Sequence, residues 1–126
     1  MSAACPFCNL PAERILHDNA DTVGIRDAFP VSEGHTLIIP KRHVASFFDL
    51  TPAERNSLME LLDWANSDLL SRFGPDACNL GINDGVAAGQ TVLHLHVHLI
   101  PRYVGDISDP RGGVRWVLPS RAKYWD

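Results

Sequence analysis

The sequence has 126 residues and no apolar run that approaches the roughly 20 residues of a membrane-spanning helix. Near its start there is no basic segment followed by an apolar core, so we expect no secretory signal. The net charge of −4 shows no excess of basic residues, which argues against a general nucleic-acid-binding protein but leaves a small anionic ligand open. These absences predict one soluble, cytoplasmic domain over residues 1–126, with neither a membrane nor a nucleic acid as its partner.

The sequence is also poor in cysteine. Three cysteines, an odd number, do not make the disulfide framework of a small secreted domain, and a reducing compartment is the default. Two of them form the pair Cys5-Pro6-Phe7-Cys8. A redox pair needs a thioredoxin-like strand–helix context, which is absent. Half of a zinc site needs two more ligands, for which His43 and His94 are the best candidates, and two incidental thiols are the third interpretation.

What the sequence does contain is a run of three histidines at spacing two, within the stretch from Gly89 to Arg102. Aliphatic residues fill the gaps, and this alternation is typical of a half-buried strand. Since alternate residues of a strand point to the same face, we expect His94, His96 and His98 to form a row on one face.

Four interpretations of the row compete. It is a solvated strand face, a metal site, a site of nucleophilic catalysis by imidazole, or a split row with one structural end and two chemical histidines. His94 and His98 cannot share one metal ion, because their Cα atoms would lie roughly 13 Å apart with parallel side chains.

The remaining elements are one long helix and four strands, which we expect near residues 14–17, 23–27, 35–40 and 77–83. Thr51 is the expected N-cap of the helix, Pro52 its first residue, and Glu54 completes a capping box. The helix is expected to end near Phe73, and its apolar residues at spacings of three and four form a core-facing stripe.

The stretch from His94 to Ile100 resembles the signature of the histidine triad (HIT) superfamily, in which histidine and hydrophobic residues alternate. Residues 26–27, 34–43, 83–85 and 89–91 extend the resemblance, which is to the bacterial branch that is similar to diadenosine polyphosphate hydrolases. It implies an α+β fold: an antiparallel sheet of about five strands, one long and one short helix, and a C-terminal tail over residues 104–126. It also implies a homodimer.

The resemblance implies a role for each candidate site residue. His96 is the nucleophile at the α-phosphorus of a nucleotide, His98 binds a non-bridging oxygen, and His94 and His35 support them. The expected substrate-binding residues, for the ribose, the phosphates or the leaving group, are Asp27, Asn83, Gly89, Gln90 and Thr91. In similar bacterial proteins an N-terminal arm, here residues 1–10, binds structural zinc, which implies the ligands Cys5, Cys8, His43 and His94. No catalytic metal is required, and a substrate that arrives as a magnesium complex is compatible with this chemistry.

The resemblance leaves the substrate open. Asn83 is typical of the nucleotide-binding branch of the superfamily, whereas Thr91 departs from that branch. A dinucleoside polyphosphate hydrolase or transferase, a nucleoside phosphoramidase and a nucleotide-binding module with little turnover all fit. For the tail, either Trp116 and Trp125 pack on the sheet or on a partner subunit, or arginines at positions 111 and 115 reach an outer phosphate.

Overall fold

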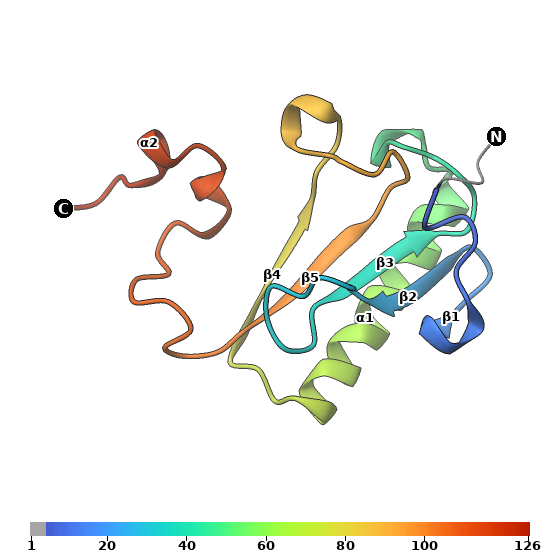
Figure 1. Ribbon diagram of the computed structural model, residues 1–126, viewed down its shortest axis with the longest axis horizontal. Helices are drawn as coiled ribbons and strands as arrows, with labels where there is room; N and C mark the ends of the chain where they lie inside the picture. Colours follow the sequence, from blue (N-terminus) through green and yellow to red (C-terminus); the bar gives the residue numbers. More distant parts are fainter. Residues whose placement is uncertain (1–4) are drawn as a thin grey trace.

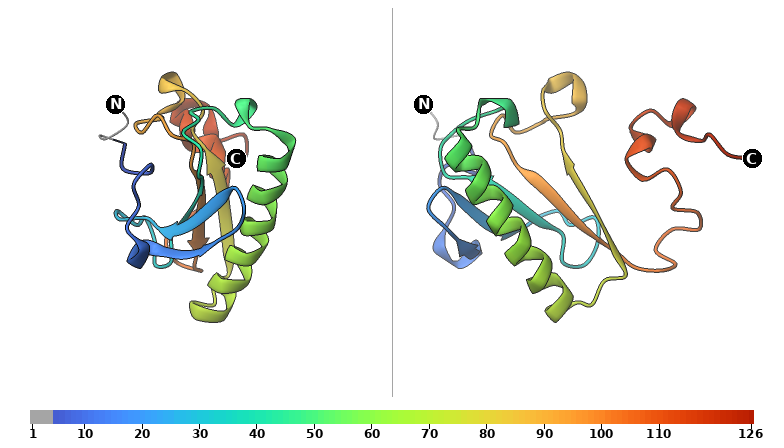
Figure 2. Two further views of the ribbon diagram at one scale, coloured as in Figure 1. Left: turned by 90° about the vertical axis from the view of Figure 1, so that its right-hand side faces the viewer. Right: turned by 180° about the vertical axis from the view of Figure 1, so that it is seen from behind.

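The computed structural model describes residues 5–126, and it confirms the predicted α+β fold. One antiparallel sheet has the strand order β1-β2-β3-β5-β4, and the long helix α1 lies along one of its faces (Figures 1 and 2). The strands are β1 (Ile15–Asp18), β2 (Thr22–Arg26), β3 (Thr36–Pro40), β4 (Ala77–Ile82) and β5 (Val97–Arg102), and the α-helices are α1 (Pro52–Arg72) and α2 (Pro119–Ala122). Short 3-10 helices are η2 (Ala12–Arg14), η3 (Phe47–Asp49), η4 (Val86–Ala88) and η5 (Gly113–Val117). Residues 1–4 of the predicted N-terminal arm lie outside the described residues.

The predicted start of the long helix is confirmed. The Thr51 hydroxyl accepts a hydrogen bond from the Glu54 amide, and the Glu54 carboxylate accepts one from the Thr51 amide, so both halves of the capping box are present. The Arg42 guanidinium donates to the same carboxylate and holds the pKa of Glu54 at about 2, helped by the Thr51 amide. The buried stripe of α1 packs on β2 and β3, and its residues Leu58, Leu61, Ala65 and Leu69 share one apolar cluster with buried residues of β3 and β5.

The opposite face of the sheet carries a second apolar cluster. Four buried residues of β2 and β3 form it, and Phe7 and Leu10 of the N-terminal arm pack against them. Leu37 belongs to this cluster and pairs with His98 across β3 and β5, so His98 points to the face that α1 leaves uncovered. The tail lies beyond β4, at the other end of the molecule from the arm (Figure 1).

The prediction that all three histidines lie on one strand is wrong, because β5 begins only at Val97. Its pairing with both neighbours also starts there: Val97 pairs with Ile82, the last residue of β4, and with Ile38 of β3, whose end at Pro40 has no amide hydrogen to give. The Leu95 amide instead donates to the carbonyl of Val44, 2.7 Å away. The segment before β5 is therefore anchored outside the sheet, and this leaves its histidines to point in different directions.

A glycine sets the start of β3. Gly34 has φ +92, and a Cβ at this position would lie 2.9 Å from side-chain atoms of both Leu69 and Phe73 at the end of α1. Only glycine tolerates both the backbone angle and the close approach. The turn that ends in His35 is thereby pressed against α1, which fixes where the His35 ring can lie.

Within residues 5–126 the structure contains no helix with the length and apolar character needed to cross a membrane.

Candidate active site

His96 and His98 lie side by side on the uncovered face of the sheet. Their ring centroids are 5.1 Å apart, and the Phe7 ring lies 5.1 Å from His96 on the side of the N-terminal arm. His94 is fully buried and turns toward the cysteine pair instead. The split-row interpretation is thus the one that matches the observed arrangement.

The backbone selects the tautomer of His96. Its Nδ1 lies 2.9 Å from the carbonyl oxygen of His94, and because a carbonyl only accepts, Nδ1 carries the proton. The lone pair of the neutral ring is then on Nε2. A fixed acceptor for the second nitrogen is what a nucleophilic imidazole requires, and the structure supplies it.

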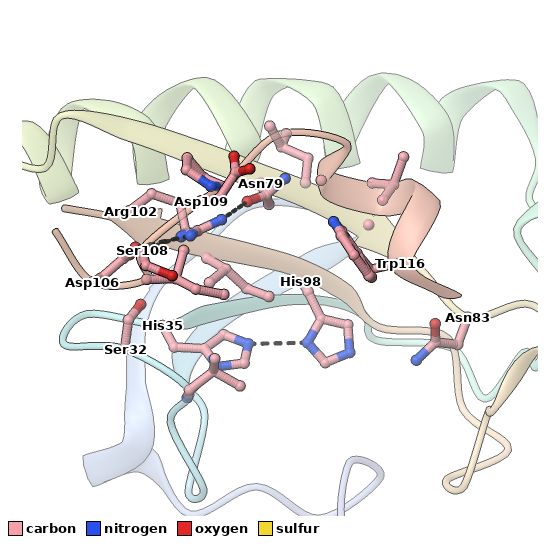
Figure 3. A pocket seen from close by; sticks show the side chains of 18 of the residues that line it. Ser32, His35, Asn79, Asn83, His98, Arg102, Asp106, Ser108, Asp109 and Trp116 are labelled. Carbon is pink, nitrogen blue, oxygen red and sulfur yellow. Dashed lines mark hydrogen bonds and ion pairs between the residues drawn. The ribbon is translucent and has the colours of Figure 1, made fainter. Parts of the chain in front are cut away.

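Two hydrogen bonds in series, from Val31 to His35 and from His35 to His98, set the tautomer of His98. The Val31 amide donates to His35 Nδ1 at 3.0 Å, so the proton of neutral His35 is on Nε2. That nitrogen lies 3.0 Å from His98 Nδ1 and donates to it (Figure 3). The remaining proton of His98 is therefore on Nε2, where it is available to an anionic oxygen.

Burial keeps these two supporting imidazoles neutral. Loss of hydration lowers the pKa of His98, and the neighbouring His96 and His35 lower it further. The pKa of His35 is also lowered by burial, although the nearby Asp27 carboxylate opposes the effect. Neutral rings preserve the hydrogen-bond chain, because a proton on His35 Nδ1 would displace the Val31 amide.

Because the His35 pKa is lowered below its ordinary value of 6.5, acid should favour the unfolded chain. His35 takes up a proton near pH 6.5 in the unfolded chain but not in the folded protein. The contribution of His35 to the free energy of unfolding is therefore constant above this pH, and it falls as the pH is lowered below it. We expect the loss between pH 7 and 5.5 to be smaller by up to about 1 kcal/mol in His35→Gln than in the unmodified protein. Urea unfolding at the two pH values measures it.

The exposed His17 of β1 provides the matched control. His17→Gln should keep the full pH dependence. A pH dependence that is the same in His35→Gln as in the unmodified protein contradicts the assignment of a neutral, buried His35.

Two of the predicted substrate-binding residues lie on either side of the pair formed by His35 and His98. Asp27 Oδ2 lies 3.5 Å from His35 Nε2, and its Oδ1 accepts the Phe29 amide, so the carboxylate both closes a turn and faces the site. Asn83 lies on the other side of His98, and both residues line a cavity (Figure 3).

The three predicted residues of the loop before the histidines, 89–91, differ in their burial and their contacts. Gln90 is 4% exposed, and its amide bonds to the Gly85 amide and to the carbonyls of Ala45 and Val92, which commits it to holding the loop. Both amide hydrogens of the side chain are thereby used within the protein, and the contact of Gln90 with substrate stays a prediction. Gly89 has φ +97, which favours glycine, and Thr91 is exposed.

The four predicted metal ligands meet at one place. One ligand atom from each of Cys5, Cys8, His43 and His94 lies within 4.8 Å of the other three. The measured separations are 3.4 Å from Cys5 Sγ and 3.6 Å from Cys8 Sγ to His94 Nδ1, and 3.1 Å from Cys8 Sγ and 3.2 Å from His94 Nδ1 to His43 Nδ1. Tetrahedral zinc with bonds of about 2.1 and 2.3 Å has ligand separations of about 3.3 to 3.8 Å, close to these values.

The second nitrogen of His94 supports the same conclusion. Nε2 lies 2.8 Å from the Pro40 carbonyl and must carry the proton, which leaves the Nδ1 lone pair directed at the cysteines. A metal-binding histidine is normally oriented by such a bond. The donor set therefore fits zinc.

Asp27, His35 and His98 form a second group with three potential ligand atoms within 4.8 Å. Here the hydrogen bonds argue against a metal. The Val31 amide occupies His35 Nδ1 and puts the proton on Nε2, the atom that would have to bind. The group is better suited to the proton chain that orients His98.

Sequence reasoning missed the cavity in which His35 and His98 lie. It measures about 920 Å³, and residues of β4, β5 and the tail form its walls (Figure 3). The tail arginines that were one candidate for phosphate binding are engaged elsewhere: Arg111 pairs with Asp109, and Arg115 donates to the carbonyls of Arg121 and Ala122. Neither lines the cavity, which argues against the predicted arginine–phosphate contact; the predicted burial of Trp116 is wrong as well, because its side chain is 46% exposed.

The fold is an open antiparallel sheet that presents two imidazoles of fixed tautomer beside a ligand-sized cavity. Residues 9–105 match the model of the HIT domain, and the chain belongs to the HIT family. An uncharacterised HIT-like protein of Mycoplasma genitalium is 33% identical over 106 residues, which cover 81% of this chain and 75% of that protein.

Two further relatives have informative names. The bis(5'-nucleosyl)-tetraphosphatase (asymmetrical) of Schizosaccharomyces pombe is 45% identical over 80 residues, 64% of this chain but only 44% of that protein. The crystal structure of a zinc-bound histidine triad family protein from Mycobacterium smegmatis superposes with a TM-score of 0.73 at 32% identity, and covers 97% of this chain and 96% of that chain.

Proposed function

We propose that this protein is a nucleotide hydrolase or transferase that cleaves dinucleoside polyphosphates at an α-phosphate through a nucleotidyl-His96 intermediate. The observation that carries the proposal is the orientation of His96: its Nδ1 proton is held by the His94 carbonyl, which presents the Nε2 lone pair at the site. The S. pombe relative, named for hydrolysis of such substrates, supports the substrate class.

In the first step, one bond forms and one bond breaks. His96 Nε2 forms a bond to the α-phosphorus while the bond from that phosphorus to the bridging oxygen breaks, and the oxygen leaves with the electron pair. His98 Nε2–H donates to a non-bridging oxygen, where negative charge matters in the transition state. We assign Asn83 and Thr91 to the phosphate oxygens or the leaving group, and Asp27 to the ribose hydroxyls, from which a carboxylate can accept hydrogen bonds.

The second step returns the enzyme to its starting state. Water attacks the phosphorus of the nucleotidyl-histidine, the phosphorus–nitrogen bond breaks with its electron pair returning to Nε2, and the proton of the water passes to solvent. The product is a nucleoside monophosphate. Imidazole suits both halves because it is nucleophilic when neutral near pH 7 and is also a good leaving group.

We also propose that Cys5, Cys8, His43 and His94 hold one structural zinc ion. The tetrahedral separations of their ligand atoms and the tautomer of His94 support it, as does the zinc-bound M. smegmatis relative. Bound there, zinc would supply cross-linking rather than catalysis, because it would tie the N-terminal arm to the segment that precedes the nucleophile.

Release of nucleoside monophosphate from a panel of substrates tests the proposed activity. Diadenosine triphosphate, diadenosine tetraphosphate and adenosine phosphoramidate are incubated separately with the protein. We expect AMP from the dinucleotides. Faster release from the phosphoramidate would instead assign a phosphoramidase, and tight binding of all three without AMP release would assign a binding module.

A further inference from the structure

The cavity beside His98 is larger than the phosphoryl chemistry requires. Its volume of about 920 Å³ falls in the range of about 300–1,000 Å³ that pockets for drug-sized ligands occupy. His96 is not among the residues that line it, whereas His98 and Asn83 are. We therefore assign the cavity to the group on the far side of the attacked phosphorus from His96. In an in-line displacement, the leaving group departs in that direction.

Two tryptophans from the tail give this space an aromatic wall. Trp116 and Trp125 both line the cavity, together with apolar residues of β4 and β5 such as Leu80 and Ile100. The Trp116 indole donates to the Arg111 carbonyl at 2.8 Å, which fixes the plane of the ring. Figure 3 shows Trp116 at the end of the cavity where His98 and Asn83 lie.

The charges around the cavity leave a cation available. Arg102 is paired with Asp106, and Asp109 is paired with Arg111. Lys123 also lines the cavity; the part of the chain that the structure describes shows no direct ion pair to its ammonium group, which acts on Asp109 only through its charge and helps to lower the pKa of that carboxyl. A base-stacking surface combined with a cation is the chemistry that recognises a nucleotide.

We propose that residues 106–125 of the tail form a subsite for the leaving group, which takes a purine nucleotide with its base stacked on Trp116 and its outer phosphate near Lys123. This proposal rests on the proposed function and specifies its substrate as one with two nucleosides. The matched HIT domain model ends at residue 105, so this wall of the cavity is built by a part of the chain outside that model. The phosphoryl chemistry and the choice of leaving group are then assigned to different segments.

The first test compares two substrates that share an adenylyl group. For Trp116→Ala we expect kcat/KM for diadenosine triphosphate to fall by about tenfold, the loss expected for one base stack. The fall for adenosine phosphoramidate, whose leaving group is ammonia, should be at least fivefold smaller. Val117→Ala is the matched control, because Val117 is an exposed neighbour on η5 that does not line the cavity. Equal losses on both substrates, or no loss on either, overturn the subsite.

A binding measurement keeps the subsite testable whether or not the protein turns substrate over. In the His96→Ala background, calorimetry gives dissociation constants for diadenosine triphosphate and for AMP. We expect Trp116→Ala to raise the dissociation constant of diadenosine triphosphate about tenfold, an increase at least fivefold larger than that for AMP. If the dinucleotide binds no more tightly than AMP when Trp116 is present, the subsite is wrong. If this dependence on Trp116 is found but the unmodified protein releases no AMP, the proposed function fails and the subsite stands.

Discussion

His96→Ala is expected to lower the rate of AMP release from diadenosine triphosphate by at least about 10³-fold, while the dissociation constant for the substrate changes by less than about tenfold. The rate falls because no other side chain offers a nitrogen lone pair at that position: the Nδ1 of His98 is occupied by His35, and its Nε2 carries the proton. Binding should persist because we assign the ribose, phosphate and base contacts to other residues. Single-turnover AMP release and calorimetry measure the two quantities.

Two variants separate loss of the nucleophile from local damage. His96→Asn keeps an N–H within reach of the His94 carbonyl but has no nucleophilic nitrogen, and we expect it to be as inactive as His96→Ala. His17→Ala removes an exposed histidine of β1 and should leave the rate unchanged. Turnover of His96→Asn at more than a few per cent of the normal rate would remove His96 as the nucleophile.

Metal analysis of the purified protein is expected to find about one zinc ion per chain, and Cys8→Ala is expected to lose it. The N-terminal arm contacts the sheet through Phe7 and Leu10, and the segment before β5 is held outside the sheet, so both depend on the cluster of Cys5, Cys8, His43 and His94. Loss of zinc should cost about 3 kcal/mol of folding free energy and lower the melting temperature by about 10 °C. Zinc content and thermal unfolding, with and without a chelator, measure these effects.

Cys78 provides the control within the same chain. It lies in β4, away from the cluster, so Cys78→Ala should retain both the zinc and the response to the chelator. If zinc is structural, activity under chelation should decline together with the folded fraction. Activity abolished at full retention of the fold would instead assign a catalytic metal to the histidines, and a metal-free protein of unchanged stability would refute the zinc site.

The sequence by itself determined the elements and the histidine signature. The start of α1 was predictable because its capping box lies within four consecutive residues, and the sheet strands were predictable from local alternation. The grouping of Cys5 and Cys8 with His43 and His94 came from the family resemblance, since these residues lie far apart in the chain.

Only the tertiary structure decided the different positions and tautomers of the three histidines. Alternation predicted one row, but β5 pairs with β3 only up to Ile38 and with β4 only up to Ile82, which leaves the segment before β5 outside the sheet. The tautomers of His96 and His98 then follow from a backbone carbonyl and a backbone amide, groups that carry no side-chain signal in a sequence. The cavity walled by Trp116 was hidden for a related reason: it exists only because the tail folds back against β4, a contact between segments that no local pattern encodes.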